Sequence, residues 1–437
     1  MKLNRYTYVV PFNDEKKIIF NGLNQDFIII ENEELSSYMA IMNNPDKYMS
    51  SHPRIVSRLK NRGFILEDKM DPKIFLQYQR RHFIDAPVYK SVILPTFECN
   101  YKCWYCIQKH TPLKLDEEKL NLIVKHDKKY LLENNIKEYI LSWFGGEPLT
   151  QPDIVVRISQ EMKNFCEEHN IVFTGAATTN GALLNTDLIA KLNDCGINHY
   201  QIAIDGDEIT HNRVKHDSLS ESSFALIMGN ICNVAQSNKD ARITLRVNYT
   251  IEILRNKRIV DDVLKYIPVE IREQIIVDLQ RVWQIQENLV PMEDLIWLQN
   301  AFASNGFYLE SSHIFAICYV EKKHYNMFYY NGGVEKCDKR TPDTLRGYIN
   351  EDGDVVWKEK PLFPDYDLFA KDCVCSDCDY YPLCLSGCPV ERENEIAKNP
   401  DKKIVCGFGD DYSILETRIR DYCWRVYHNL KYKLYEK

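Results

Sequence analysis

Between residues 91 and 279, short apolar segments alternate with helical patterns, and this alternation limits the possible folds more than any other feature. The apolar segments predict strands at 91–96, 139–144, 171–173, 199–204, 243–247 and 275–279. The segments between them predict helices at 116–134, 152–168, 185–195, 221–236 and 256–267. Strands that alternate with helices form parallel sheets. Six of them predict an α/β fold with a partial (β/α)6 barrel, whose functional loops follow the C-terminal ends of the strands.

Three cysteines, Cys99, Cys103 and Cys106, follow the first predicted strand with C-x3-C-x2-C spacing. Thiolates are soft ligands that suit iron–sulfur clusters or zinc. Three of them on one loop can hold a [4Fe–4S] cluster and leave one iron open for a small molecule, as catalytic zinc sites leave one position open. A zinc knuckle or three unrelated thiols are the alternatives, although structural zinc favours C-x2-C spacing and a fourth ligand.

This loop, with the aromatic Tyr105 before its last cysteine, resembles the signature of radical S-adenosylmethionine (SAM) enzymes. The resemblance implies that the three cysteines hold a [4Fe–4S] cluster whose open iron binds the amino and carboxylate groups of SAM. It also implies reductive cleavage of SAM to methionine and a 5′-deoxyadenosyl radical, which takes hydrogen from a substrate. The protein would then supply binding, orientation and the exclusion of side reactions.

Motifs after the next predicted strands resemble the same family. Residues 145–148 resemble the GGEP motif that holds the SAM amino group, and their glycines allow the backbone to approach a ligand closely. Residues 178–181 resemble a TNG turn that lies near SAM, and residues 204–206 end the fourth strand with Asp-Gly. The resemblance assigns SAM contacts to Tyr105, Gly145, Gly146, Glu147, Pro148, Asn180, Asp205 and Arg246.

The segment 211–215 departs from the family's H-D-x-x-R pattern, because it ends in Lys215. Lysine does not replace arginine in bidentate binding of a carboxylate. Arg213 and Arg246 are therefore alternative partners of the SAM carboxylate. A surface ion pair is the other interpretation for all three side chains.

The C-terminal part contains a second group of cysteines, in an order and spacing that resemble the SPASM domain of radical SAM enzymes. The resemblance implies two auxiliary [4Fe–4S] clusters. The first would be held by Cys318, Cys337 and Cys388, and the second by Cys375, Cys378, Cys384 and Cys406. The first set lacks a fourth cysteine, so that site is either open for substrate or closed by Cys373 or His313. Two structural zinc sites are the alternative, because zinc and iron compete for such thiolates.

Composition excludes several classes of partner. The 437 residues carry a net charge of −8, which argues against nucleic acid or an anionic membrane as the main partner. No apolar run approaches the roughly 20 residues of a membrane span. The first residues lack the apolar region of a signal peptide, so we expect a cytoplasmic protein. In that compartment, 15 cysteines indicate metal ligation rather than disulfides.

Residues 1–75 predict a small winged-helix-like unit. Strands are expected at 6–10, 17–20, 26–30 and 63–66, and helices at 32–42 and 53–62. The unit resembles peptide-recognition domains in which a leader peptide adds a strand to an exposed sheet edge. A packing extension without a binding role is the alternative. The remaining predicted parts are a polar linker at 76–90, the barrel at 91–305, a SPASM domain at 306–410 and a C-terminal helix at 411–437.

Together these resemblances imply a radical SAM/SPASM peptide maturase, an oxidoreductase-type enzyme. It would modify a precursor peptide that carries a leader sequence, by a crosslink such as a thioether or by epimerisation. An electron donor such as flavodoxin or ferredoxin would reduce it. An anaerobic sulfatase maturase that forms formylglycine is the first alternative, disfavoured by the 98 residues before Cys99. An iron–sulfur electron-transfer or scaffold protein is the second, but it would need no SAM pocket at 145–148.

Overall fold

The chain forms two compact units in the computed structural model. The first contains Met1–Asp85, Ser312–Lys322 and Leu362–Trp424, and the second contains Ala86–Ser311, Lys323–Pro361 and Arg425–Lys437. The structure describes all residues except 109, 217–220, 283, 285–290, 313, 341–343, 362–366, 371–372, 399–405, 407–411 and 436–437.

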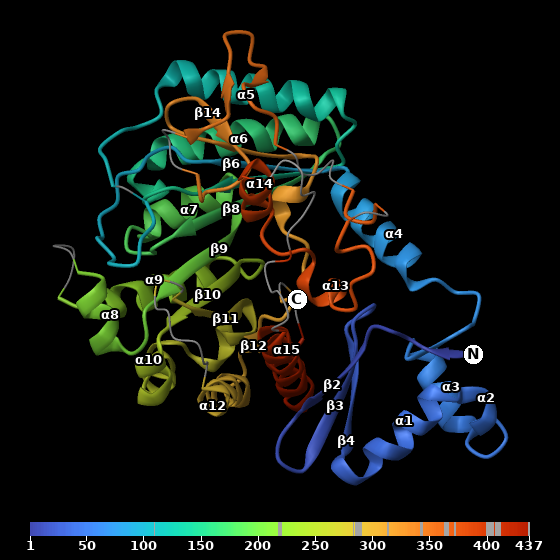
Figure 1. Cartoon of the computed structure of the whole chain (residues 1–437). Helices are drawn as coiled ribbons and strands as arrows, with labels where there is room; N and C mark the ends of the chain where they lie inside the picture. The colour runs from blue at the N-terminus through green and yellow to red at the C-terminus, as the bar shows by residue number, and fades with distance from the viewer. Residues whose placement is uncertain are drawn as a thin grey trace. The chain divides into compact units, whose positions relative to one another are not determined.

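The second unit contains a large, mostly parallel sheet (Figure 1). Six strands that are consecutive in the sequence are also neighbours in the sheet, and each pairs in parallel with the next. They are β6 (Val88–Ile93), β7 (Glu138–Trp143), β8 (Val172–Thr179), β9 (Ile197–Ile204), β10 (Arg242–Tyr249) and β11 (Ile275–Arg281). The predicted six-stranded parallel arrangement is therefore confirmed.

Helices connect these strands, as the alternating pattern predicts. They are α5 (Glu117–Glu133), α6 (Pro152–Glu168), α7 (Thr186–Asp194), α8 (Glu208–Val214), α9 (Ser223–Ser237), α10 (Ile251–Asn256), α11 (Ile259–Tyr266) and α12 (Met292–Ser304). The bounds of α6 are those predicted, whereas α8, α10 and α12 were not predicted. Figure 1 shows α5, α6 and α7 beside the strands β6 to β9.

Along each strand of the barrel, successive residues alternate between two kinds of surroundings. Residues such as Leu141, Ile202 and Val247 are fully buried, and they belong to the main hydrophobic core that the strands share with these helices. Their neighbours on the other face of the strands, including Gln201 and Arg246, are half-buried. Because crossover helices cover the outer face of a parallel sheet, the half-buried side chains point toward the barrel interior.

Further strands extend this sheet at both edges. Beside β11 lies β12 (Tyr308–Leu309), and beside β6 lies β13 (Tyr325–Phe328), both in parallel. The sheet then continues in antiparallel order through β14 (Gly333–Glu335), β15 (Gly347–Ile349) and β16 (Val355–Trp357). The structure thus divides the chain differently from the predicted domains. Part of the segment 306–410 belongs to the second unit, because its strands pair with β6.

A buried polar network connects the early parts of the neighbouring strands. Asp127 on α5 accepts hydrogen bonds from the hydroxyls of Tyr89, at 2.7 Å, and Tyr139, at 2.6 Å. Asn326 on β13 donates to the Tyr89 hydroxyl at 3.2 Å. Since buried polar groups are costly unless they are hydrogen-bonded, this network fixes the position of β13 beside β6 and β7.

The first unit begins with an antiparallel sheet of order β2-β3-β4. Its strands are β2 (Thr7–Pro11), β3 (Lys16–Asn21) and β4 (Asp26–Glu31), followed by α1 (Leu35–Asn43), α2 (Pro45–Tyr48) and α3 (Pro53–Asn61). A short pair joins β1 (Lys2–Leu3) to β5 (Ile65–Leu66). Ile19, Met42, Val56 and Phe64 form its small core. The predicted order of strands, helices and a final strand is confirmed.

The prediction of a polar linker at 76–90 is wrong. Residues Pro72–Asp85 form α4, and β6 begins at Val88. Leu76, Arg80 and Ile84 are spaced by four residues, so they lie on one face of the helix and are buried there. The positive charge of Arg80 conceals this apolar pattern in the sequence.

The rest of the first unit is made of short elements. They are η4 (Tyr319–Glu321), α13 (Tyr381–Cys384), α14 (Pro389–Lys398) and the N-terminal part of α15 (Ser413–Lys431). Cys423 on α15 is buried, as the sequence predicts for a packed cysteine. Among the described residues, the structure contains no helix with the length and apolarity needed to cross a bilayer.

Candidate active site

The cysteine loop follows the C-terminal end of β6. Cys99 and Cys103 are half-buried, Cys106 is exposed, and none of the three forms a disulfide. The Cys99 sulfur accepts a hydrogen bond from the Tyr101 amide at 3.4 Å. The Cys106 amide donates to the Cys103 carbonyl at 3.1 Å. Burial raises the pKa of Cys99 to about 11 and also raises that of Cys103. These thiols therefore need a nearby positive charge to ionise at neutral pH.

The turn after β7 is packed directly against this loop. The Gly146 amide donates to the Thr96 carbonyl at 3.1 Å, and the Glu147 amide donates to the Glu98 carbonyl at 2.8 Å. A Cβ on Gly145 would lie 2.5 Å from the Thr96 oxygen, and one on Gly146 would lie 2.2 Å from the Glu98 oxygen. The sequence predicts close approach of a ligand to these glycines, and the structure shows that the chain leading into Cys99 also packs closely against them.

Glu147 connects this turn to the one after β8. Its carboxylate is fully buried and accepts hydrogen bonds from the Leu149 amide at 3.0 Å, the Thr179 hydroxyl at 2.8 Å and the Asn180 amide at 2.7 Å. Burial raises the pKa of Glu147 to about 7, although these hydrogen bonds lower it. The glutamate therefore positions the two turns through its own hydrogen bonds.

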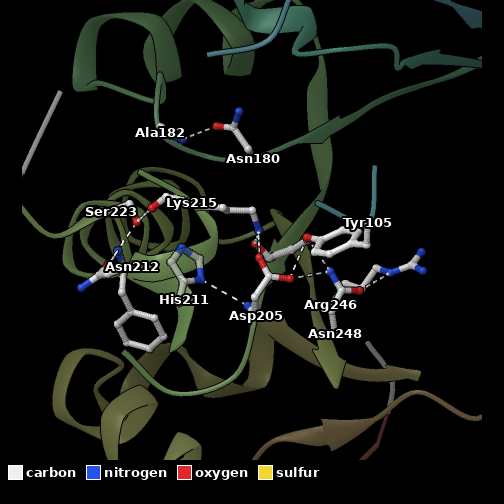
Figure 2. Close-up of polar contacts among 12 residues, drawn as sticks. Tyr105, Asn180, Ala182, Asp205, His211, Asn212, Lys215, Ser223, Arg246 and Asn248 are labelled. Carbon is white, nitrogen blue, oxygen red and sulfur yellow. Dashed lines mark hydrogen bonds and ion pairs between the residues drawn. The ribbon is translucent and has the colours of Figure 1, made fainter. Parts of the chain in front are cut away.

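Asn180 reaches from the second turn to the cysteine loop. Its Nδ2 donates to Asn100 Oδ1 at 2.7 Å and lies 3.8 Å from the Cys99 sulfur. Its Oδ1 accepts from the Ala182 amide at 3.0 Å (Figure 2). Both ends of the amide are used, so its orientation toward Cys99 is fixed.

A buried ion pair follows β9. Lys215 Nζ lies 2.9 Å from Asp205 Oδ2, and both side chains are 3% exposed (Figure 2). Asp205 Oδ1 accepts hydrogen bonds from the Tyr105 hydroxyl at 2.7 Å and from Asn248 Nδ2 at 3.0 Å. A surface ion pair is therefore wrong for Lys215. The segment 211–215 looks solvent-exposed in the sequence, but α8 ends there and turns the lysine inward toward the Ala203 carbonyl, at 2.6 Å.

The charges of this cluster are strongly coupled. Burial alone would raise the pKa of Asp205, but Lys215, His211 and the hydrogen bonds hold it below its usual value. Burial, with the Lys215 charge beside it, lowers the pKa of His211 to about 3. Burial and the Asp205 carboxylate raise the pKa of Tyr105. At neutral pH the cluster therefore contains an ionised Asp205, a neutral His211 and a protonated Tyr105.

A cavity of about 310 Å³ opens at this end of the barrel. Five of the eight predicted SAM contacts lie in its wall: Tyr105, Gly145, Gly146, Asn180 and Arg246. Glu147 and Pro148 are buried beside the turn, and Asp205 lines a neighbouring cavity of about 440 Å³ that shares Tyr105 and Asn248. Lys215 also lies in the wall of the smaller cavity. The barrel thus brings together residues separated by more than 100 positions in the sequence.

The sequence missed three polar residues in the same wall. Arg281 lies at the end of β11, and Gln284 donates to the Tyr105 carbonyl. Asp338 follows Cys337, and burial raises its pKa although Arg246 opposes that rise. The position of Asp338 depends on the pairing of β13 with β6, which no local pattern reveals. Arg281 could have been found from its place two residues after the sixth predicted strand.

Comparison with known proteins decides the family of this site. Residues 93–227 match the family model described as the radical SAM superfamily. The chain carries a radical SAM domain. This match covers the cysteine loop and the strands β7, β8 and β9 with their turns.

Two curated proteins are similar to parts of the chain. Radical SAM cyclopropyl synthase TigE of Paramaledivibacter caminithermalis is 23% identical over 212 residues, which are 42% of this chain and 44% of TigE. Mycofactocin maturase MftC of Mycobacterium ulcerans is 23% identical over 369 residues, which are 77% of this chain and 92% of MftC. The match with TigE thus spans less than half the length of that relative.

A solved structure shares the fold. Native anSMEcpe with bound AdoMet and Cp18Cys peptide superposes with a TM-score of 0.54 and 16% sequence identity. The superposition covers 80% of this chain and all of that one. It shows the radical SAM α/β fold.

A radical SAM domain implies a [4Fe–4S] cluster and SAM, and the residues of this site fit both. Cys99, Cys103 and Cys106 offer three thiols with no disulfide partner beside the cavity. Among the described residues, no three His, Cys, Asp or Glu side chains converge on one metal ion. A four-iron cluster binds each thiolate at a different corner, so its ligands need not converge. The cavity volume lies within the roughly 300–1,000 Å³ of ligand sites.

A second group of cysteines surrounds a cavity of about 130 Å³ in the first unit. This cysteine cavity is lined by Cys375, Cys378, Cys384, Cys388 and Cys406. All four residues predicted to hold the second auxiliary cluster are among them. The cavity is narrow, and its other lining residues include Tyr381 and Tyr412.

The set predicted for the first auxiliary cluster is divided between the units. Cys318 and Cys388 belong to the first unit, and Cys337 belongs to the second. Cys373, a candidate fourth ligand, hydrogen-bonds to Cys375. His313, the other candidate, lies outside the described residues.

Proposed function

We propose that this protein is a radical SAM peptide maturase. The observation that supports it most is the cavity in the barrel, because the cysteine loop, the glycine turn, Asn180 and Arg246 all meet there. The relative that spans most of the chain is a maturase by name. When bound, the cluster and SAM would supply one-electron cleavage of SAM and a radical that abstracts hydrogen.

The chain's own residues have distinct roles in this proposal. Cys99, Cys103 and Cys106 would hold the cluster, and Asn180 would orient the loop through its contact with Asn100. Arg246, half-buried in the cavity wall, would bind the carboxylate of SAM. Such a charge-assisted bond is stronger than a neutral one.

Asp205 and Lys215 would keep Tyr105 in place at the boundary of the two cavities. The Tyr105 hydroxyl is fixed by Asp205 at 2.7 Å, and its carbonyl is fixed by Gln284. Asp338 lines the same wall and would be the carboxylate that accepts a proton from a bound substrate. Its substitution by asparagine should therefore slow product formation while SAM cleavage continues.

The substrate would be a ribosomally made precursor peptide. A hydrogen would be taken from a Cα or Cβ of its core, and the product would be a crosslink or an epimer. The cysteine cavity would hold an auxiliary [4Fe–4S] cluster. Anaerobic reconstitution of the wild type with iron, sulfide, SAM and dithionite should yield 5′-deoxyadenosine, and Cys103→Ala should yield none. Production by the variant at the wild-type rate would contradict the assignment of the loop.

The leader of the precursor would add a strand to β4. On the other edge of this sheet, Tyr8 of β2 donates to the Asp379 carbonyl and Phe12 stacks on Trp424 at 3.8 Å. Asn32 N donates to Glu15 O at 2.9 Å, and hydrogen-bonded pairs alternate along an antiparallel ladder. Ile29 lies opposite Ile18, three positions before Asn32, so this pair is one of the pairs that do not exchange hydrogen bonds. The N–H and C=O of Ile29 therefore point away from β3. They are available to an added strand.

Ile29→Pro tests this assignment, since it removes the outward N–H and leaves the ladder with β3 intact. Isothermal titration with peptides encoded by small open reading frames beside the gene should show about five- to tenfold weaker binding, the value of one backbone hydrogen bond. Ile29→Val, which keeps the N–H, is the matched control. Equal affinity of both variants would exclude β4 as the binding edge.

A further inference from the structure

Three buried charges lie together in the first unit. The side chains of Arg80 on α4, Glu321 in η4 and Arg392 on α14 are 6%, 1% and 6% exposed. Both guanidinium groups approach Glu321 Oε2, and Arg392 Nη2 lies 3.4 Å from it. Two arginines and one glutamate leave this charge triad with one positive charge in excess. Replacing buried ion pairs by apolar residues is often neutral or stabilising, so stability alone does not explain such a triad.

Arg392 is the member of the triad that lines the cysteine cavity. Its Nη1 donates to the hydroxyl of Ser386, in the loop that joins Cys384 to Cys388. Leu385 and Ser386 in this loop have φ values of 51° and 64°, which side chains other than glycine rarely adopt. Arg392 therefore stabilises the strained loop that carries two of the cysteines, and its charge lies beside them.

Burial makes the charge of Arg392 effective at the cysteines. A charge acts over a longer distance in a protein interior than in water, where solvent and salt screen it. Two carboxylates of the same helix, Glu391 and Glu395, lie in the same cavity wall. Glu391 is exposed, so solvent screens its charge, and Glu395 is 42% exposed and lies 2.9 Å from Lys398, which balances it. Both therefore offset Arg392 only weakly. The reduction potential of an iron–sulfur cluster depends on nearby charge, hydrogen bonds and solvent exposure.

We propose that Arg392 is a positioning residue that raises the reduction potential of an iron–sulfur cluster held by Cys375, Cys378, Cys384 and Cys406. A buried positive charge favours the more negative, reduced form of such a cluster. Glu321 holds the arginine in place, and Arg80 balances Glu321. This inference rests on the proposed function, because that proposal assigns a cluster to the cysteine cavity.

The test is a redox titration followed by electron paramagnetic resonance on the full chain. A Cys99/Cys103/Cys106→Ala background removes the signal of the cysteine loop, and the signal lost on Cys375→Ala/Cys378→Ala identifies the cluster in question. Arg392→Gln should shift its midpoint potential to a more negative value, and Arg392→Lys should leave it near that of the background. Glu321→Gln, which removes a negative charge, should shift it to a more positive value.

Glu391→Gln is the matched control, because this carboxylate lines the same cavity but is exposed. It should leave the midpoint unchanged, and a shift as large as that of Glu321→Gln would overturn the argument from burial. An unchanged midpoint in Arg392→Gln with full iron content would also overturn the inference. If Arg392→Gln loses the cluster, an unchanged midpoint in Glu321→Gln overturns it instead. Iron content that is not lowered by Cys375→Ala/Cys378→Ala would overturn the cluster assignment itself, and the inference with it.

Discussion

The ion pair between Asp205 and Lys215 gives a quantitative test of the site's electrostatics. Lys215→Met leaves the Asp205 carboxylate without the charge that lies 2.9 Å away, in a place where both side chains are 3% exposed. Removing one partner of a buried pair costs about 3–5 kcal/mol in the free energy of unfolding. Tyr105 and Asn248 still donate to Asp205, so we expect the lower end of this range, about 3 kcal/mol.

A double-mutant cycle separates the pair from other effects of these substitutions. Asp205→Asn alone leaves the lysine charge buried and should also destabilise the protein. The double variant removes both charges. Its loss of unfolding free energy should be well below the sum of the losses in the two single variants. Lys265→Met is the control, since Lys265 is 61% exposed and lies 3.4 Å from Glu208. Its loss in the free energy of unfolding should be much smaller than that of Lys215→Met, because solvent screens an exposed pair.

Urea unfolding of the full chain, followed by tryptophan fluorescence, measures these differences at pH 7. In the wild type the folded pKa of Asp205 is lowered, so its contribution to stability is present above its unfolded pKa and is lost as pH falls through the folded value. In Lys215→Met the Asp205 carboxylate is buried without a compensating charge, so the pKa of Asp205 in the folded state should rise above its value in the unfolded state. Stability of that variant should therefore increase from pH 7 to pH 5. Two outcomes would refute the reasoning. One is that the losses of unfolding free energy in the cycle are additive, and the other is that Lys215→Met loses no more unfolding free energy than Lys265→Met.

Three further substitutions test other contacts of the site and the fold. Gly146→Ala would place a Cβ 2.2 Å from a backbone oxygen of the cysteine loop, so we expect it to lose the cluster in iron analysis after reconstitution. Gly229→Ala on α9, where a Cβ meets nothing within 4 Å, should keep its iron. Burial raises the folded pKa of Glu147 to about 7, so its contribution favours folding below its unfolded pKa and is lost as pH rises through 7. This loss, about 3 kcal/mol, should appear as a fall in Tm between pH 5 and 8 that is absent in Glu147→Gln. Asp127→Asn leaves one tyrosine hydroxyl without its carboxylate oxygen and should cost about 1–3 kcal/mol in urea unfolding. A change below the error of the measurement would mean that the network does not stabilise β13.

The parallel strands and most of their helices could be predicted because their signals are local. The helix at 152–168 has an apolar face that is visible in the sequence, and α6 has the same bounds. The glycines at 145 and 146 predicted close approach of their backbone to a ligand, and the structure shows that they also allow close packing against the backbone of residues 96–98. The resemblance to the SPASM domain grouped Cys375, Cys378 and Cys384, which lie within ten positions of each other, and all three line one cavity in the structure.

Other parts of the site depend on contacts between distant segments, and no local pattern contains them. Lys215 follows α8 and looks exposed in the sequence, but its charge is balanced by Asp205, which comes directly after β9 and is itself held by the distant residues Tyr105 and Asn248. Arg80 interrupts an apolar helix face because Glu321, more than 200 positions later, compensates its charge. Asp338 enters the cavity wall through the pairing of β13 with β6. For Arg80 and Asp338 the deciding partner lies far along the chain, and Lys215 depends on distant residues through the partners of Asp205.

The pairing of β6 with β13 has a consequence for synthesis on the ribosome. Phe328 lies opposite Ile93 in the ladder, about 235 residues later in the chain. Until that segment has emerged, the edge of β6 next to the cysteine loop stays unpaired, and an unpaired strand edge can join another chain. Contacts so distant in sequence also slow folding. Nascent chains that stop before residue 325 should therefore aggregate more readily than the full-length chain, with the cysteine loop beside the exposed edge.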